Sequence, residues 1–318
     1  MVWLYIIIFL VSCVVLVKSG VWVVKSLIKI AQFLEWREFI VSSVLMAFST
    51  SLPELFIGIS SAFHHKSELS FGMVIGSNII ALTLVVSLGA IWAKGLKFKG
   101  KVLQRSSIYA GIYGLLPYIL MIDGEISRSD GLILLLALSF YFIQLLSQEE
   151  HFTKVFADHF KRDWVHFKLF LKNLAIFWLG IILLLSSSEG VVFSASRIAE
   201  YFNLPLVIIG ALLVAFGTSL PEISFGLRSI VMGHEDMILG DVMGSVVINS
   251  ALVLGLIALI SPLKIPNFSP YLRGTFFTVA TCLFFVLFAR TDRKITKNEA
   301  IFLLSIYILF FLAEFLAK

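Results

Sequence analysis

Long apolar stretches recur along the whole chain of 318 residues, separated by short segments that contain proline, glycine or charged residues. A helix of about 20 apolar residues can cross a hydrocarbon core of about 30 Å, because a helix satisfies its own backbone hydrogen bonds. Hydrophobic residues make up 59% of the chain and charged residues only 14%, which excludes an ordinary soluble domain. The sequence therefore predicts an all-α integral membrane protein.

The apolar stretches, divided at proline, glycine and charge, predict ten transmembrane helices in two sets of five. The expected ranges are 2–24, 38–63, 69–93, 106–122, 130–147, 172–193, 205–232, 237–260, 271–289 and 298–316. One long polar connection separates the two sets. We expect a first five-helix repeat at 1–147, a cytoplasmic linker at 148–171 and a second five-helix repeat at 172–318.

The distribution of charge and cysteine limits the partners. The net charge of +5 comes from basic residues in short loops, where lipid headgroups are the expected partners and nucleic acid is not. Most Lys and Arg lie on the cytoplasmic side if both termini face outward. Cys13 and Cys282 lie in apolar stretches, which predicts neither a disulfide framework nor a metal–sulfur cluster. The first stretch lacks a leader's basic region and cleavage site, so we interpret it as a retained helix.

A repeated motif predicts an internal duplication. The segment Ala47–Glu54, Ala-Phe-Ser-Thr-Ser-Leu-Pro-Glu, recurs as Ala215–Glu222, Ala-Phe-Gly-Thr-Ser-Leu-Pro-Glu, at an offset of 168 (222 − 54). The same ungapped offset carries three further polar or glycine positions onto their equivalents: Gly72 onto Gly240, Gly76 onto Gly244 and Ser77 onto Ser245. Corresponding helices are five crossings apart, an odd number, so the halves form an inverted repeat.

Glu54 and Glu222 carry the chemistry of this motif. Each lies inside an apolar stretch, where an ionised carboxylate costs about 2.5 kcal/mol on insertion scales. No Lys or Arg lies within one helical turn of either glutamate, whereas Thr50 and Thr218 each precede one by four residues and share its helix face. A bound cation explains this arrangement better than an ion pair does.

The surrounding residues predict an all-oxygen site. Pro53 and Pro221 are expected to break their helices and free backbone carbonyl groups towards the site. Ser77 and Ser245, beside glycines that also suit helix packing, offer further hydroxyl groups. Carboxylate, hydroxyl and carbonyl oxygens are the ligands of hard cations such as calcium and sodium. The repeated motifs contain no His or Cys, which argues against zinc and copper.

These motifs resemble those of the cation/calcium exchanger superfamily, specifically its sodium/calcium exchanger branch of prokaryotic type. That branch carries Gly-Thr-Ser-Leu-Pro-Glu followed by Gly-Ser-Asn-Ile in two alpha repeats. The resemblance implies a ten-helix antiporter of a prokaryotic inner membrane, exchanging sodium for calcium by alternating access. It implies no enzyme activity, no cofactor beyond the transported ions and no obligate protein partner.

The resemblance also implies roles for individual residues. Glu54 and Glu222 would share the central calcium ion, with Thr50 and Thr218 contributing to it. The flanking sodium sites would be lined by Ser51, Ser77, Ser219 and Ser245 and by the backbone oxygens of Ala47 and Ala215. The amide of Asn249, the repeat equivalent of Ala81, would lie at the middle of the site.

Three positions depart from the family pattern. Ser49 replaces a glycine, Val246 stands where the first repeat has Asn78, and Ala81 stands where the family has Asn or Asp. Ala81 offers no side-chain oxygen, so a middle ion or water position is expected to be weakened. With two glutamates and no third acid, the empty site is expected to carry about two negative charges.

Other functions remain open at this level. A calcium/proton or broader divalent cation antiporter fits the same carboxylates, and Ala81 makes sodium coupling less secure. An intramembrane hydrolase lacks a base for Ser51 or Ser219, and a membrane scaffold would leave two buried acids without a task. His64, His65, His234 and Glu189 are expected to be solvated residues at the membrane surface.

Overall fold

A computed structural model describes residues 2–33, 45–98, 100–147, 164–231, 235–265, 268–291 and 293–316. These residues form helices joined by short turns and four two-residue strands, so the prediction of an all-α architecture is confirmed for the described part of the chain. The helices of the first half are α1 (Val2–Phe33), α2 (Leu45–Phe63), α3 (Ser67–Ile80), α4 (Val86–Trp92), α5 (Gly100–Leu120) and α6 (Arg128–Ser147). Those of the second half are α7 (Trp164–Phe202), α8 (Leu206–Ile209), α9 (Ala215–Thr218), α10 (Leu220–Val231), α11 (Glu235–Val247), α12 (Leu254–Ile260), α13 (Ser269–Arg290) and α14 (Lys297–Leu316).

Turns of π or 3₁₀ geometry lie between or directly after several of these helices. The π-helical turns η2 (Ala81–Val85), η4 (Gly210–Val214) and η5 (Ile248–Val253) join α3 to α4, α8 to α9 and α11 to α12, and a 3₁₀ turn, η3 (Met121–Asp123), follows α5. Eight helical segments of the described residues are long and apolar enough to cross a membrane, by length and composition. Their bounds are Val2–Ile30, Ser67–Trp92, Leu103–Asp123, Lys168–Phe202, Leu206–Val231, Met237–Ile260, Ser269–Arg290 and Lys297–Leu316.

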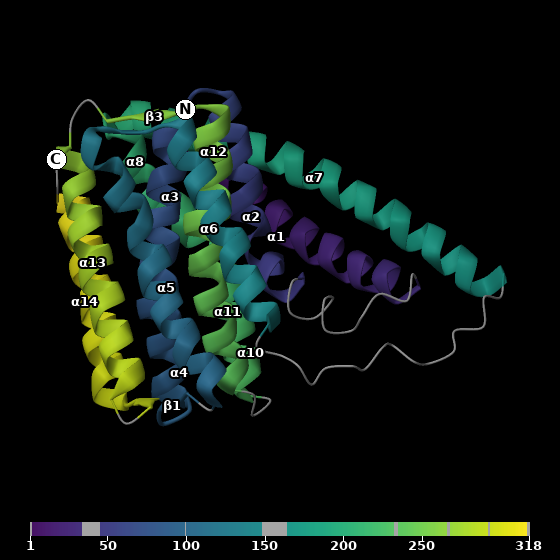
Figure 1. The fold of residues 1–318 in the computed structure, drawn as a ribbon. Helices are drawn as coiled ribbons and strands as arrows, with labels where there is room; N and C mark the ends of the chain where they lie inside the picture. Colours follow the sequence, from purple (N-terminus) through teal and green to yellow (C-terminus); the bar gives the residue numbers. More distant parts are fainter. Residues whose placement is uncertain are drawn as a thin grey trace.

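Helices α1 and α7 are both longer than predicted. α1 continues to Phe33, and α7 runs from Trp164 to Phe202, so the last residues of the expected linker, 164–171, are helical. Residues 148–163 of that linker lie outside the described residues. The two helices pack along each other and cross the flank of the bundle at a steep tilt (Figure 1). A tilted helix needs more residues to cover the same membrane thickness, which accounts for their length.

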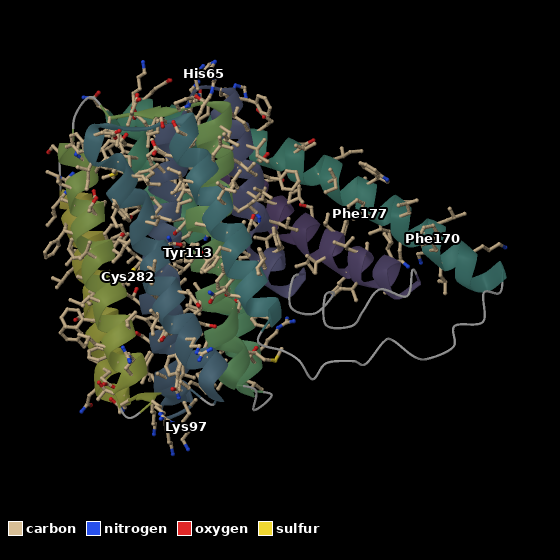
Figure 2. All side chains as sticks on the ribbon, viewed as in Figure 1. His65, Lys97, Tyr113, Phe170, Phe177 and Cys282 are labelled. Carbon is tan, nitrogen blue, oxygen red and sulfur yellow. The ribbon has the colours of Figure 1, made fainter. Side chains whose placement is uncertain are left out.

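Two short strand pairs join the halves at opposite ends of the bundle. β1 (Leu96–Lys97) pairs antiparallel with β4 (Lys294–Ile295), and β2 (Glu125–Ile126) pairs with β3 (Leu263–Lys264). Each pair contains one strand from each half. The repeat offset of 168 carries Leu96 of β1 onto Lys264 of β3 and Ile126 of β2 onto Lys294 of β4, so the two strand pairs occupy corresponding places, although their registers differ by two residues. β1 and Lys97 lie at one end, whereas β3 and His65 lie at the other (Figures 1 and 2).

Helix α3 contacts the segment of α8 and η4 through its glycines. A Cβ atom on Gly72 would lie 2.0 Å from the backbone oxygen of Val207, and one on Gly76 would lie 2.0 Å from that of Ala211. From the other side, a Cβ on Gly210 would lie 2.1 Å from the oxygen of Leu69. These glycines therefore allow backbone-to-backbone contact between the halves, which brings the two repeated motifs close together.

Candidate functional site

The two motif glutamates lie in the middle of the protein rather than at its surface. Glu54 on α2 is 0% exposed and Glu222 on α10 is 2% exposed. α2 packs against α3, α11 and η5, so the first motif is surrounded by segments of both halves. The motif hydroxyl groups of Thr50, Thr218 and Ser51 are buried with them.

Hydroxyl pairs link the first motif of one half to the second motif of the other. Thr50 Oγ1 and Ser245 Oγ are 3.1 Å apart, and Ser77 Oγ and Thr218 Oγ1 are 3.4 Å apart. The repeat offset exchanges these pairs, because 218 − 50 and 245 − 77 both equal 168. The structure thus brings four of the predicted residues together in two equivalent contacts.

Several buried oxygens at this centre have no hydrogen-bond partner among the described residues. They are both carboxylate oxygens of Glu54, Oε2 of Glu222, Oγ of Ser51 and Oδ1 of Asn249. The ion pairs formed by the described residues involve neither glutamate. Buried polar atoms without partners are costly, and carboxylates most of all, so this arrangement is suited to a cation.

The backbone around the second motif differs from that of the first. α2 continues through Pro53 without interruption, so the predicted break there is wrong. In the second half the helix is interrupted at Ser219 (φ −81°, ψ 0°), between α9 and α10. Pro221 then falls in the first turn of α10, where its missing N–H removes no helix bond, whereas Pro53 removes a single bond that the neighbouring helical turns and packing tolerate.

Of the two predicted backbone ligands, Ala215 has contacts that the structure describes and Ala47 does not. The carbonyl of Ala215 accepts hydrogen bonds from the backbone N–H of Ser219 at 3.0 Å and from Thr218 Oγ1 at 3.2 Å. Ser219 is itself buried beside it. Ala47 lies near the start of the described part of α2, and its side chain is outside the described set.

Asp241 is a third acid of the site, so the expectation of only two is wrong. Its side chain is 6% exposed, and Thr50 Oγ1 donates a hydrogen bond to its Oδ1 at 3.0 Å. The repeat comparison passes over this residue because its equivalent in the first half is Met73. A helix-face argument would have found it, since Asp241 precedes Ser245 by four residues.

The middle of the site is formed by the π-helical turns. Ala81 begins η2 and Asn249 lies in η5, both buried, and Ala81 leaves this position without a side-chain oxygen. Asn78 Nδ2 donates to Ser250 Oγ at 2.8 Å, a contact between the halves that sequence reasoning missed. Wide helical turns of this kind are frequent at functional sites.

A separate polar cluster joins α7 to the end of α2. His64 Nε2 lies 2.6 Å from Glu189 Oε2, and Ser60 Oγ donates to Glu189 Oε1 at 2.8 Å. The sequence predicts a solvated side chain for Glu189, but the structure gives it partners on and beside α2. α7 continues beyond Glu189 to Phe202 and so places it next to α2. His65 Nδ1 lies 3.4 Å from Ser261 Oγ, and His234 lies outside the described residues.

Across the described ranges, no group of three or more His, Cys, Asp or Glu side chains is close enough to hold one metal ion. The three carboxyl groups therefore do not converge on a single point. Asp241 lies beside the hydroxyl of Thr50 and Glu54 beside those of Thr218 and Ser77, an arrangement suited to several neighbouring hard-cation positions.

Comparison with known proteins gives a consistent result. The family model described as sodium/calcium exchanger protein matches residues 4–146 and 172–316. The inner membrane protein YrbG of Escherichia coli is 29% identical over 227 residues, which are 70% of each chain. The sodium/calcium exchanger MaX1 of Methanosarcina acetivorans is 27% identical, over 97% of each chain.

The fold is also similar to a solved structure. The sodium-calcium exchanger NCX_Mj, soaked with 2.5 mM Na⁺ and 10 mM Sr²⁺, superposes with a TM-score of 0.65 at 28% sequence identity. The match covers 97% of this chain and 98% of that one. The likeness therefore extends over both halves of the chain.

Proposed function

The chain belongs to the sodium/calcium exchanger protein family, as its motifs predict, and we propose that it is an antiporter that exchanges sodium for calcium across a membrane. The observation that carries this proposal is the pair of buried glutamates. Glu54 and Glu222 retain carboxylate oxygens without a described partner, inside a protein whose helices are suited to lipid. Transported cations would neutralise them.

We propose that Glu54 and Glu222 share calcium with the hydroxyl groups of Thr50 and Thr218. The flanking sodium positions then use the side chains of Ser51, Ser77, Ser219 and Ser245 and the carbonyls of Ala47 and Ala215, and the amide of Asn249 serves the middle of the site. The unpaired Oγ of Ser51 and Oδ1 of Asn249 support these assignments. Calcium and sodium are substrates here, and the proposal includes no resident cofactor.

We propose ten membrane crossings, with α2 and α6 added to the eight segments above, arranged as two inverted five-helix repeats. The repeat offset supports this, since it relates the two strand pairs and the two hydroxyl pairs. The basic end that carries Lys97 would face the cytoplasm of a prokaryotic cell, with both termini outside the inner membrane. α1 begins and α14 ends at the opposite end (Figure 1).

Exchange rather than leak follows from the cost of burying charge. Carboxylates without a cation cannot cross the apolar barrier cheaply, so the carrier changes orientation only when it is loaded. We propose that α1 and α7 slide together over the other helices, because they pack mainly along each other and lie on the flank of the bundle (Figure 1). This movement would open the site to one side at a time.

Uptake of radioactive calcium into proteoliposomes tests the proposal. We expect uptake driven by an outward sodium gradient, absent with potassium or proton gradients, and lost in Glu54→Gln. The control is Glu200→Gln, because Glu200 is an exposed acid paired with Arg197. Uptake driven by protons alone would identify a calcium/proton antiporter, and the absence of uptake under every gradient would exclude calcium exchange.

A further inference from the structure

Asp241 extends the site towards the end of the bundle that carries Lys97. α11 begins at Glu235 and contacts β1 at that end, so Asp241 lies one helical turn nearer to it than Ser245 (Figure 1). Its side chain is more than nine-tenths buried. It is thus part of the interior and not of the charged surface.

The contacts of Asp241 form a small oxygen cluster. Thr50 Oγ1 lies 3.0 Å from Asp241 Oδ1 and 3.1 Å from Ser245 Oγ. One carboxylate from α11 and two hydroxyl groups, one from each half, therefore meet at a single place. A cation at this place would contact all three side chains.

The neighbouring acids indicate that a cation is favoured there. Asp241 lies close enough to Glu54 and Glu222 for electrostatic repulsion between the carboxylates. Glu54 is completely buried, and neither of its carboxylate oxygens has a described partner. Mutually repelling buried carboxylates without a base are stabilised when a proton or a bound cation neutralises them, so the place favours a cationic ligand.

The composition of the cluster favours a monovalent ion. Calcium sites in proteins use six to eight oxygens and usually more than one carboxylate. Among the described residues the three acids are not grouped closely enough to hold one metal ion, which favours a separate ion position at Asp241. A single carboxylate with two neutral hydroxyl groups balances the one charge of sodium and not the two of calcium. We therefore propose that Asp241 binds a sodium ion together with Thr50 and Ser245. This inference rests on the proposed exchange function and assigns that function a third carboxylate.

The proposed sodium position makes the two halves unequal. Met73 occupies the equivalent place in the first half, so the acid beside the equivalent hydroxyl pair, Ser77 with Thr218, is the central Glu54 and not an additional one. The extra charge therefore lies only on the side of the site that faces the Lys97 end. Sodium binding from the two faces of the membrane is expected to differ in strength for this reason.

Sodium dependence of calcium transport in Asp241→Asn proteoliposomes tests the inference. Asparagine has the same shape and still accepts the Thr50 hydrogen bond, but it removes the charge. We expect the sodium concentration for half-maximal exchange to rise about tenfold, the scale of one lost charge-assisted contact. The number of sodium ions exchanged per calcium is expected to fall by one. Asp241→Glu, which keeps the charge, should retain most of the wild-type sodium dependence.

Calcium/calcium exchange, which needs no sodium, separates this inference from the proposed function. We expect it to persist in Asp241→Asn, and the melting temperature in detergent shows independently whether the variant is folded. Glu68→Gln, an acid on α3 outside the cluster, is the matched control and should leave both assays unchanged. Ser245→Ala, which removes a second proposed ligand, should weaken sodium dependence in the same direction.

Two results would overturn the assignment. Unchanged sodium dependence in Asp241→Asn would show that Asp241 only positions Thr50, and loss of calcium/calcium exchange in a folded variant would make it a calcium ligand. A wild-type protein without sodium-driven calcium uptake would remove the proposed function itself, whatever the variants do.

Discussion

Thr50 is the residue at which the polar contacts of the site meet. Its hydroxyl group contacts both Asp241 and Ser245, and it lies one turn before Glu54 on α2. Thr50→Val preserves the shape of the side chain but removes both contacts. Because the Thr50 hydroxyl is also a proposed calcium ligand, and a polar contact to a charged group contributes about 1.5–3 kcal/mol, we expect the apparent calcium affinity to fall at least tenfold, measured from the calcium dependence of uptake.

The control for this prediction is Thr275→Val on α13. Thr275 donates only to the carbonyl of Tyr271 in its own helix, so its loss should leave calcium affinity unchanged. An unchanged affinity in Thr50→Val would contradict a ligand role for this hydroxyl group.

At the residue scale, symmetry determined what the sequence could predict. Glu54, Glu222 and their threonines are present in both halves, and the structure places all four in the interior. Asp241 has no equivalent acid, so a comparison of repeats gives it no weight. The contact between Asn78 and Ser250 joins residues that are not related by the repeat, and spatial proximity of this kind is not visible in a linear sequence.

The glycines of α3 are the element-scale feature most sensitive to change. A Cβ atom at position 76 would lie 2.0 Å from the Ala211 oxygen and 2.5 Å from the Ala215 Cβ, both in the facing segment. Backbone atoms cannot turn aside as a flexible side chain does, so Gly76→Ala must separate α3 from η4. We expect a loss of about 1–3 kcal/mol of stability or more, seen as a lower melting temperature in detergent.

Gly20→Ala is the matched comparison on α1. Nothing lies within 4 Å of a Cβ at that position, and alanine favours a helix over glycine by about 1 kcal/mol. We therefore expect equal or higher stability for this variant. Equal melting temperatures for Gly76→Ala and the wild type would show that α3 and η4 are not in backbone contact.

At the element scale, the number of apolar segments was easier to predict than their ends. Charged and small residues near the ends of α1 and α7 look like loop residues in the sequence, but a tilted helix continues through them. The break at Pro53 was predicted from a local clash, yet α2 packs against segments of both halves and remains intact. Tertiary packing decided both outcomes, and sequence periodicity does not report it.

At the scale of the whole molecule, the proposed sliding of α1 and α7 can be tested with a native cysteine. Cys13 on α1 faces Gly217 on α9, and a Cβ built on Gly217 would lie 3.8 Å from the Cys13 Cβ. Disulfides join Cβ atoms at about 3.8 Å. We expect Gly217→Cys to form a disulfide with Cys13 under oxidation, to arrest calcium uptake and to recover on reduction.

The control combines Gly217→Cys with Cys13→Ala, which cannot form the bond and should be insensitive to oxidation. Mass spectrometry measures the disulfide independently of transport. Full exchange activity in the cross-linked protein would show that α1 does not move relative to α9, and the sliding model would then be wrong.

The strand pairs have a further consequence for the synthesis of the protein. β1 ends at Lys97, and its partner β4 begins 197 residues later in the chain, since 294 − 97 equals 197. Until then β1 has an open edge, and each hydroxyl pair lacks its second member until Thr218 and Ser245 have been made. Translation that stops early in the second half therefore leaves a product with exposed edges that quality-control proteases can recognise, and the ion site is assembled only once α11 and η5 have been inserted.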